Sequence, residues 1–191
     1  SCPGYLLTQN GVQSNGDLTA DFSATIKISE GGDGTIIQGF NITSESPLEI
    51  LVPNVVITRC KVDCDVYIGT DATNCVLHQN LFTGLVGRHN YTSYIAYNAQ
   101  ITNNIFMRVP NEYYGVLRGI SESIVAYNTF TKNQADQYSP VIYSMTGCTI
   151  EHNIFFGAEQ TLDNNTMNDN YWGNTDSNPL QDCTTDLEVR R

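Results

Sequence analysis

The side chains best suited to act on a polar ligand are a few basic residues in an otherwise acidic chain. Arg88 and His89 are adjacent, and Arg108 and Arg118 follow within the next 30 residues. A guanidinium group binds a carboxylate through two parallel hydrogen bonds, and an imidazole exchanges protons near neutral pH. These residue types suit a ligand that carries carboxylates, such as an acidic glycan. Isolated arginines on an acidic surface can also serve only to relieve charge repulsion, and both interpretations stay open.

Tyrosine is concentrated in the same stretches of the chain. Seven of the 11 tyrosines lie there: Tyr67, Tyr94, Tyr97, Tyr113, Tyr114, Tyr138 and Tyr143. Sugar rings stack on aromatic faces, so these residues are candidates for glycan binding. Tyrosine is also favoured in strands, and the same residues would suit an ordinary strand surface or core.

Metal sites are weakly indicated. Three aspartates around Cys64 have oxygen ligands that suit calcium, although such clusters are more often solvated turns: Asp63, Asp65 and Asp71. No other cofactor is expected. The six cysteines lack the ligand spacing of a metal site. A disulfide from Cys64 to Cys75 or Cys60 is the only one for which we expect the two cysteines to lie close enough to be bridged.

The composition narrows the range of partners. The formal charge is −11 and the pI is about 4.4. This negative field repels phosphate backbones, so no nucleic-acid partner is expected. No run of 18 apolar residues occurs, so no membrane span is expected. The even number of cysteines is compatible with an extracellular setting.

A short repeat runs through most of the chain. Each copy has an aliphatic anchor, two spacers, a turn residue, another spacer and a large apolar residue. The anchors are Ile37, Ile57, Leu77, Ile101, Val125, Ile150 and Met167. They are 20, 20, 24, 24, 25 and 17 residues apart, which is the period of a solenoid with one copy per coil. A leucine-rich repeat would need several leucines and a helical segment in each copy, and neither is present.

The turn and aromatic positions of the repeat predict the interior of this solenoid. The turn positions of the later copies hold Asn80, Asn104, Asn128, Asn153 and Asn170, and the aromatic positions hold Phe82, Phe106, Phe130, Phe155 and Trp172. We expect the asparagines to adopt the left-handed conformation of a tight turn. Their amides would stack at about 4.8 Å, the distance between neighbouring strands, beside a stack of the aromatic rings.

The remainder of each coil contains a second β-prone segment. These segments are residues 48–52, 66–68, 94–97, 116–118 and 141–143. Variable connections at residues 83–93, 107–114 and 131–140 would precede the last three segments and lengthen the middle coils. Because insertions on one face of a solenoid often carry its function, we expect the tyrosines and arginines of these stretches to form any binding site.

The repeat resembles the pectin-lyase-like superfamily of right-handed parallel β-helices. Residues 35–43 are similar to a segment typical of its members, and the sequence Asn-Tyr-Trp-Gly-Asn at residues 170–174 resembles the ending of its surface proteins. The resemblance implies an all-β, single-stranded right-handed parallel β-helix of about seven to eight coils, with 17–25 residues per coil. The helix would cover residues 24–174, between an N-terminal cap or first partial coil at 1–23 and a C-terminal cap or tail at 175–191.

The resemblance leaves the activity open, because the superfamily includes lyases, hydrolases, phage tail proteins and non-catalytic surface domains. The favoured hypothesis is a non-catalytic module on a cell or virion surface that binds a glycan or serves as a structural or adhesive element. One alternative is a polysaccharide lyase or hydrolase, for which Arg88, His89, Arg108 and Arg118 would supply the base and the cation. Another is a purely structural capsid or envelope component. Self-association or attachment to a larger surface assembly is compatible with all three.

Overall fold

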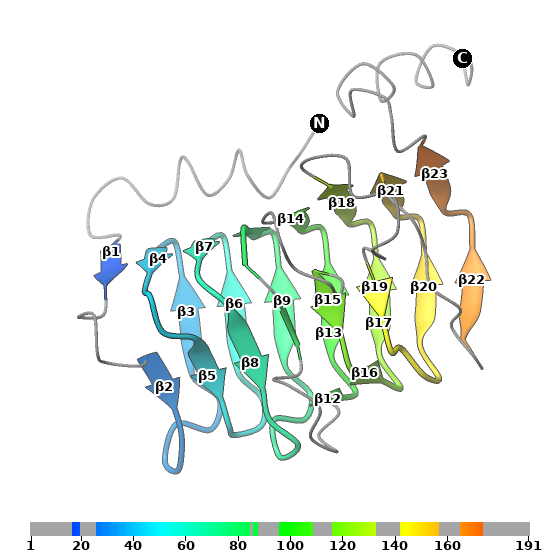
Figure 1. Ribbon diagram of the computed structural model, residues 1–191. Coiled ribbons are helices and arrows are strands. Elements are labelled where there is room, and N and C mark those ends of the chain that lie inside the picture. The colour runs from blue at the N-terminus through cyan, green and yellow to red at the C-terminus, as the bar shows by residue number, and fades with distance from the viewer. Residues whose placement is uncertain are drawn as a thin grey trace.

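The computed structural model of the chain describes residues 17–19, 26–84, 86–87, 96–108, 116–132, 142–156 and 165–173. These residues form a parallel β-solenoid (Figure 1), so the predicted fold class is confirmed. The described residues contain no helix, and therefore none that is long and apolar enough to cross a membrane.

Three parallel sheets run the length of the solenoid, and each coil passes through them in the order B, C, A. Sheet B contains β2 (Ile26–Ile28), β5 (Leu48–Ile50), β8 (Val66–Ile68), β11 (Val86–Gly87), β15 (Leu117–Arg118) and β19 (Ile142–Tyr143). Sheet C contains β3 (Ile36–Gln38), β6 (Val56–Thr58), β9 (Val76–His78), β13 (Gln100–Thr102), β17 (Ile124–Ala126), β20 (Thr149–Glu151) and β22 (Thr166–Asn168).

Sheet A contains β1 (Asp17–Thr19), β4 (Asn41–Thr43), β7 (Lys61–Asp63), β10 (Leu81–Phe82), β14 (Ile105–Arg108), β18 (Thr129–Lys132), β21 (Ile154–Phe156) and β23 (Tyr171–Gly173). A separate pair joins β12 (Ala96–Tyr97) to β16 (Ile120–Ser121). Within the described residues six coils contribute to all three sheets, fewer than the seven to eight predicted. The ends are represented only by β1 and by β22 with β23.

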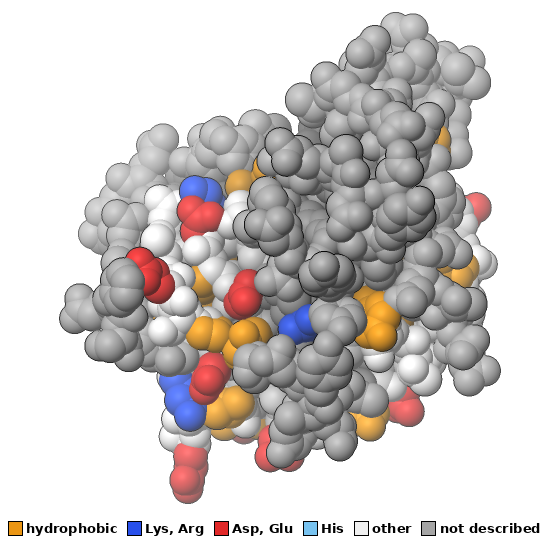
Figure 2. Space-filling view, in the orientation of Figure 1, with side chains coloured by type: hydrophobic (Ala, Val, Ile, Leu, Met, Phe, Trp, Pro, Cys, Tyr) orange, Lys and Arg blue, Asp and Glu red, His pale blue; other side chains and the backbone are white. Residues whose placement is uncertain are grey.

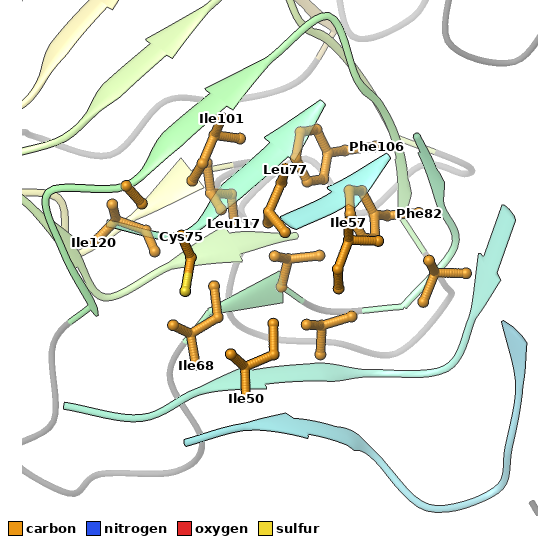
Figure 3. Packing of buried hydrophobic residues seen from close by; sticks show 14 of the residues in the cluster. Ile50, Ile57, Ile68, Cys75, Leu77, Phe82, Ile101, Phe106, Leu117 and Ile120 are labelled. Atoms are coloured by element: carbon orange, nitrogen blue, oxygen red, sulfur yellow. The ribbon is translucent and has the colours of Figure 1, made fainter. Parts of the chain in front are cut away.

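The core forms because the strands are short and alternate between the interior and the surface. In sheet C the central residue of each strand is the anchor of the repeat, and the anchors from Ile37 to Ile150 are buried. Aliphatic residues of sheet B face them from the opposite wall. Figure 3 shows Ile50 and Ile68 of sheet B packed beneath Ile57 and Leu77 of sheet C.

The phenylalanines of sheet A form a continuous aromatic stack inside the solenoid. The ring centroids of Phe82 and Phe106 are 5.1 Å apart, those of Phe106 and Phe130 are 4.7 Å apart, and those of Phe130 and Phe155 are 4.8 Å apart. All four side chains are fully buried. At Trp172 the structure describes only the backbone, which pairs in register with Phe155.

The asparagines at the turn between sheets C and A form a hydrogen-bonded ladder. The Oδ1 atom of Asn104 accepts hydrogen bonds from the backbone N–H of Asn80 at 2.9 Å and from its Nδ2 at 3.0 Å. The Nδ2 atom of Asn104 donates to the Leu77 carbonyl at 2.8 Å and to Asn128 Oδ1 at 3.0 Å. The pattern continues through Asn153 to Asn170. An interior asparagine thereby uses both donors and both acceptor positions of its amide, as burial requires.

The left-handed backbone conformation lies one residue earlier than predicted. It is adopted by the residue before each ladder position: Arg59, Gln79, Asn103, Tyr127, His152 and Asp169, with Gly39 in the first coil. The expectation that the ladder asparagines themselves adopt it was wrong. Asparagine is used at the ladder for its buried amide, and the turn is closed by the preceding residue, whose side chain points to solvent or lies half-buried.

Strand boundaries in the middle coils also differ from the prediction. The sheet B strand of this coil is β11 rather than the predicted segment at 94–97, whose described residues, Ala96 and Tyr97, form β12 and pair with β16. Glycine is a poor strand former, so a two-residue strand that ends in Gly87 carried little signal. The strands β14 and β18 extend into the expected connections, and Arg108 pairs with Lys132 in register.

Four cysteines are buried as reduced thiols in four separate turns between strands: Cys60, Cys64, Cys75 and Cys148. The expected disulfide from Cys64 to Cys75 or Cys60 is therefore wrong. Cys60 lies at the ladder position, where its thiol donates to the Thr58 carbonyl at 3.3 Å, whereas the thiol of Cys75 donates to the Ala72 carbonyl at 3.4 Å. Burial raises the pKa of all four thiols, that of Cys64 to about 11.

These thiols are expected to resist alkylation in the folded protein, because the reactive thiolate is scarce and shielded. Treatment with iodoacetamide at about pH 8 should leave all four unmodified, and denaturation should expose all four to complete modification. Peptide mass spectrometry before and after denaturation checks this. A peptide cross-linked between Cys64 and either Cys60 or Cys75 would contradict the arrangement.

Candidate functional site

The outer face of sheet B carries a single row of aligned side chains. Backbone pairing brings six residues into register on successive strands: Lys27, Glu49, Tyr67, Gly87, Arg118 and Tyr143. Lys27 and Glu49 form an ion pair with a 3.3 Å separation at the N-terminal end of the row. The remaining part combines two aromatic rings with a guanidinium group, which matches the chemistry expected for glycan binding.

Tyr67, Arg118 and Tyr143 are named here the tyrosine–arginine row. All three side chains are half-buried, and Arg118 and Tyr143 lie on adjacent strands. With about 4.8 Å between strands, the row extends for roughly 14 Å from Tyr67 to Tyr143. Figure 2 shows this face, with a cationic side chain between hydrophobic ones over the middle strands. The row can stack sugar rings and bind a carboxylate on one surface.

Gly87 occupies the strand between Tyr67 and Arg118. Its φ is 121°, which L-residues rarely adopt, and a Cβ atom there would overlap the carbonyl oxygen of Arg118. Glycine therefore lets β11 pass close to β15, and it leaves this strand without a side chain in the row. Gly84 has a similar role in the same coil, because a Cβ atom there would overlap the Cys64 carbonyl group.

The other predicted ligand-binding tyrosines do not extend the row within the described residues. Tyr97 is 37% exposed, but it lies on β12 and pairs with Ser121 outside sheet B. Four further candidates lie outside the described residues: Tyr94, Tyr113, Tyr114 and Tyr138.

The four candidate catalytic residues are not brought together by the part of the chain that the structure describes. Arg88 and His89 lie outside it. Arg108 is on β14 of sheet A, where only its backbone is described, rather than in a connection as predicted. Arg118 is on β15 of sheet B. The two described candidates, Arg108 and Arg118, thus lie on different sheets.

The aspartates proposed for calcium have other surroundings. Asp63 accepts hydrogen bonds from Lys61 Nζ at 3.0 Å and from the Thr83 hydroxyl. Both contacts lower the pKa of its carboxyl group, and the contact with Thr83 has the larger effect. Asp71 is exposed in the turn between β8 and β9, whereas Asp65 is half-buried between β7 and β8. Across the described ranges no three His, Cys, Asp or Glu side chains are grouped to hold a metal ion.

Two polar arrangements at the left-handed turn positions were not expected from the sequence. The exposed ring of Tyr127 stacks on that of His152, with centroids 4.9 Å apart, and both residues occupy left-handed turn positions. Arg59 lies next to His78, whose Nδ1 is 2.8 Å from the hydroxyl of Thr102. Only the register between coils reveals these neighbours, because they are 25 and 19 residues apart in the sequence.

The chain matches the family model described as "Periplasmic copper-binding protein (NosD)" over residues 3–181. Comparison with curated proteins found no match, and neither did comparison with solved structures. The match covers most of the chain, and its β-helical fold agrees with the solenoid and with the resemblance to the pectin-lyase-like superfamily. The chain therefore belongs to the NosD family of right-handed parallel β-helix proteins.

Proposed function

We propose that this protein is a non-catalytic, surface-exposed β-helix module that binds an acidic glycan on the outer face of sheet B. The observation that carries the proposal is the tyrosine–arginine row, in which Arg118 lies in register with Tyr143 and two strands from Tyr67. A stiff solenoid holds these side chains at a regular spacing, which suits an extended polymer of repeating units. The family description, which places NosD proteins in the periplasm, supports a location outside the cytoplasm.

A non-catalytic role is supported by the positions of the histidines and of Arg118 in the described part of the chain. General acid–base chemistry on a sugar needs a base within hydrogen-bond reach of the proton that it removes. The histidines that the structure describes, His78 and His152, lie on or beside sheet C, whereas Arg118 lies on sheet B. The lyase alternative thus depends on Arg88 and His89. A product assay on each bound ligand tests it.

Copper binding is the second candidate function, because the family description names copper. The described residues do not fit it. Copper sites use thiolate, thioether or imidazole ligands that converge on the ion. The buried thiols hydrogen-bond to separate carbonyl groups, and burial raises their pKa, which opposes the deprotonation that metal binding requires. We therefore assign no copper site to these residues.

An array of acidic and neutral oligosaccharides tests the proposal, followed by a product assay on each ligand that binds. We expect acidic oligosaccharides to bind and to be recovered intact. Tyr143→Ala should weaken binding at least about fivefold by removing one stacking surface, which corresponds to roughly 1 kcal/mol. Tyr127→Ala is the matched control, because Tyr127 is exposed on another part of the solenoid. Unsaturated sugar products would contradict a non-catalytic role, and the absence of any acidic ligand would contradict the glycan assignment.

A further inference from the structure

A second basic position lies at the turn between sheets C and A, away from the tyrosine–arginine row. Arg59 occupies the left-handed turn position after β6, and its backbone N–H donates to the carbonyl oxygen of His78 at 3.2 Å. Thr58 pairs in register with His78, and His78 pairs with Thr102. The solenoid therefore holds an arginine, a histidine and two threonines together on three neighbouring coils.

Arg59 differs from Lys27 and Lys61 in its electrostatic surroundings. Lys27 pairs with Glu49 at 3.3 Å, and Lys61 pairs with Asp63 at 3.0 Å. Among the described residues no carboxylate lies within salt-bridge distance of Arg59. An exposed guanidinium without an acidic neighbour is notable in a chain with a formal charge of −11. It offers two parallel hydrogen bonds and a positive charge to an anion from solution.

His78 is oriented beside this charge. Its Nδ1 atom interacts with the Thr102 hydroxyl at 2.8 Å, which orients the ring and leaves Nε2 as its second polar atom. Partial burial is the main reason that the pKa of His78 is lowered, and the nearby charge of Arg59 lowers it further, whereas a hydrogen bond to the backbone of Thr102 raises it. A bound anion would raise the pKa of His78 by favouring the imidazolium form, and would thus oppose the effects of burial and of Arg59.

The groups that surround His78 are otherwise uncharged or already paired. It is faced by Thr58 at the end of β6, by Arg59 in the turn that follows, and by Thr102 on β13. Across the turn, Lys61 and Asp63 on β7 are bonded to each other. No described acid therefore competes with an incoming carboxylate for Arg59.

We propose that Arg59 and His78, with the hydroxyl groups of Thr58 and Thr102, form a binding site for a small carboxylate such as the uronic acid unit of an acidic sugar. The guanidinium binds the carboxylate, and the protonated imidazole donates a hydrogen bond to it from Nε2. Binding strengthens as the pH falls through the pKa of His78, because the imidazolium adds a positive charge beside the carboxylate and donates from Nε2 whatever the role of Nδ1. This site extends beyond the proposed function, because it lies at the edge of sheet C and does not involve the tyrosine–arginine row.

The test follows the imidazole signals of the whole protein by NMR during titration with glucuronate, acetate or glucose. The protein has three histidines, and the His78→Thr variant identifies the signals of His78. We expect glucuronate and acetate to shift those signals saturably and glucose to leave them unchanged. The affinity for glucuronate should fall at least about threefold between roughly pH 5 and pH 8. A glucose response equal to that of glucuronate, or the absence of any response to glucuronate, would overturn the proposal.

Arg59→Gln is the decisive variant. Gln79 already occupies the same turn position in the next coil with φ 59°, close to the 56° of Arg59, so the substitution preserves the fold. It should abolish the glucuronate response at His78, whereas Lys27→Gln, which removes the same charge from sheet B, should preserve it. A response that survives Arg59→Gln, or that is lost equally in Lys27→Gln, would show that a local carboxylate site is absent.

Discussion

Replacing Asn104 with leucine is expected to destabilise the protein by about 4 kcal/mol. The substitution leaves the backbone N–H and the Nδ2 group of Asn80 without their acceptor, and the Leu77 carbonyl without its donor. Each polar group left buried and unsatisfied costs about 2 kcal/mol, and burial of the leucine side chain recovers about 2 kcal/mol. The free energy lost with the hydrogen bonds therefore exceeds the free energy gained by burying the leucine. The difference is a large fraction of a typical free energy of unfolding.

The neighbouring residue provides a matched control for this substitution. Asn103 lies outside the ladder in the left-handed conformation, and Gln79 occupies the same position one coil earlier. Asn103→Gln should therefore change the free energy of unfolding by less than about 0.5 kcal/mol. Urea denaturation followed by circular dichroism measures both variants. Stability of Asn104→Leu within about 1 kcal/mol of the parent would mean that the ladder contributes little.

Phe106→Ala is expected to have an effect of similar size, about 4 kcal/mol, for a different reason. The ring is fully buried between Phe82 and Phe130, at centroid distances of 5.1 and 4.7 Å. Truncation removes a large apolar surface, both stacking contacts and the support of the neighbouring coils. A buried phenylalanine replaced with alanine loses about 3–5 kcal/mol when the cavity cannot collapse, and the hydrogen-bonded sheets on either side restrict such collapse.

Met107 is the corresponding control on the opposite face of β14. It is 38% exposed, so Met107→Ala should cost less than about 1 kcal/mol. Phe106→Leu should give an intermediate loss, because it retains part of the apolar volume. Thermal unfolding of the three variants provides the ranking. Equal losses for Phe106→Ala and Met107→Ala would show that the aromatic stack is not a main source of stability.

The interior of the solenoid could be predicted because it repeats. The Asn-x-Phe pattern recurs at a nearly constant distance, and a solenoid with one repeat per coil must place equivalent residues in one row. Asn104 and Phe106 therefore lie in predictable rows without knowledge of the loops. The left-handed position was harder to predict, because it accepts Arg59, Gln79 and Tyr127, which have no shared preference for that conformation.

Contacts between surface side chains were only partly predictable, because the pairing register of the strands decides which residues become neighbours. Arg118 and Tyr143 meet because β15 and β19 pair, and a connection of uncertain length separates them in the sequence. β11 was missed because a two-residue strand that ends in Gly87 has almost no periodic signal. The proximity of Arg59 to His78 was missed for a related reason, since a left-handed arginine in one coil and a strand histidine in the next share no local motif.

The measurement that tests the central functional claim most directly is calorimetric titration of the strongest acidic oligosaccharide into the parent protein and into Arg118→Gln. Loss of the guanidinium should weaken binding at least about tenfold, which corresponds to 1.4 kcal/mol. Lys27→Gln, which removes the same charge near the N-terminal end of sheet B, should stay within about twofold of the parent. Equal affinity of Arg118→Gln and the parent would contradict a glycan site on the tyrosine–arginine row.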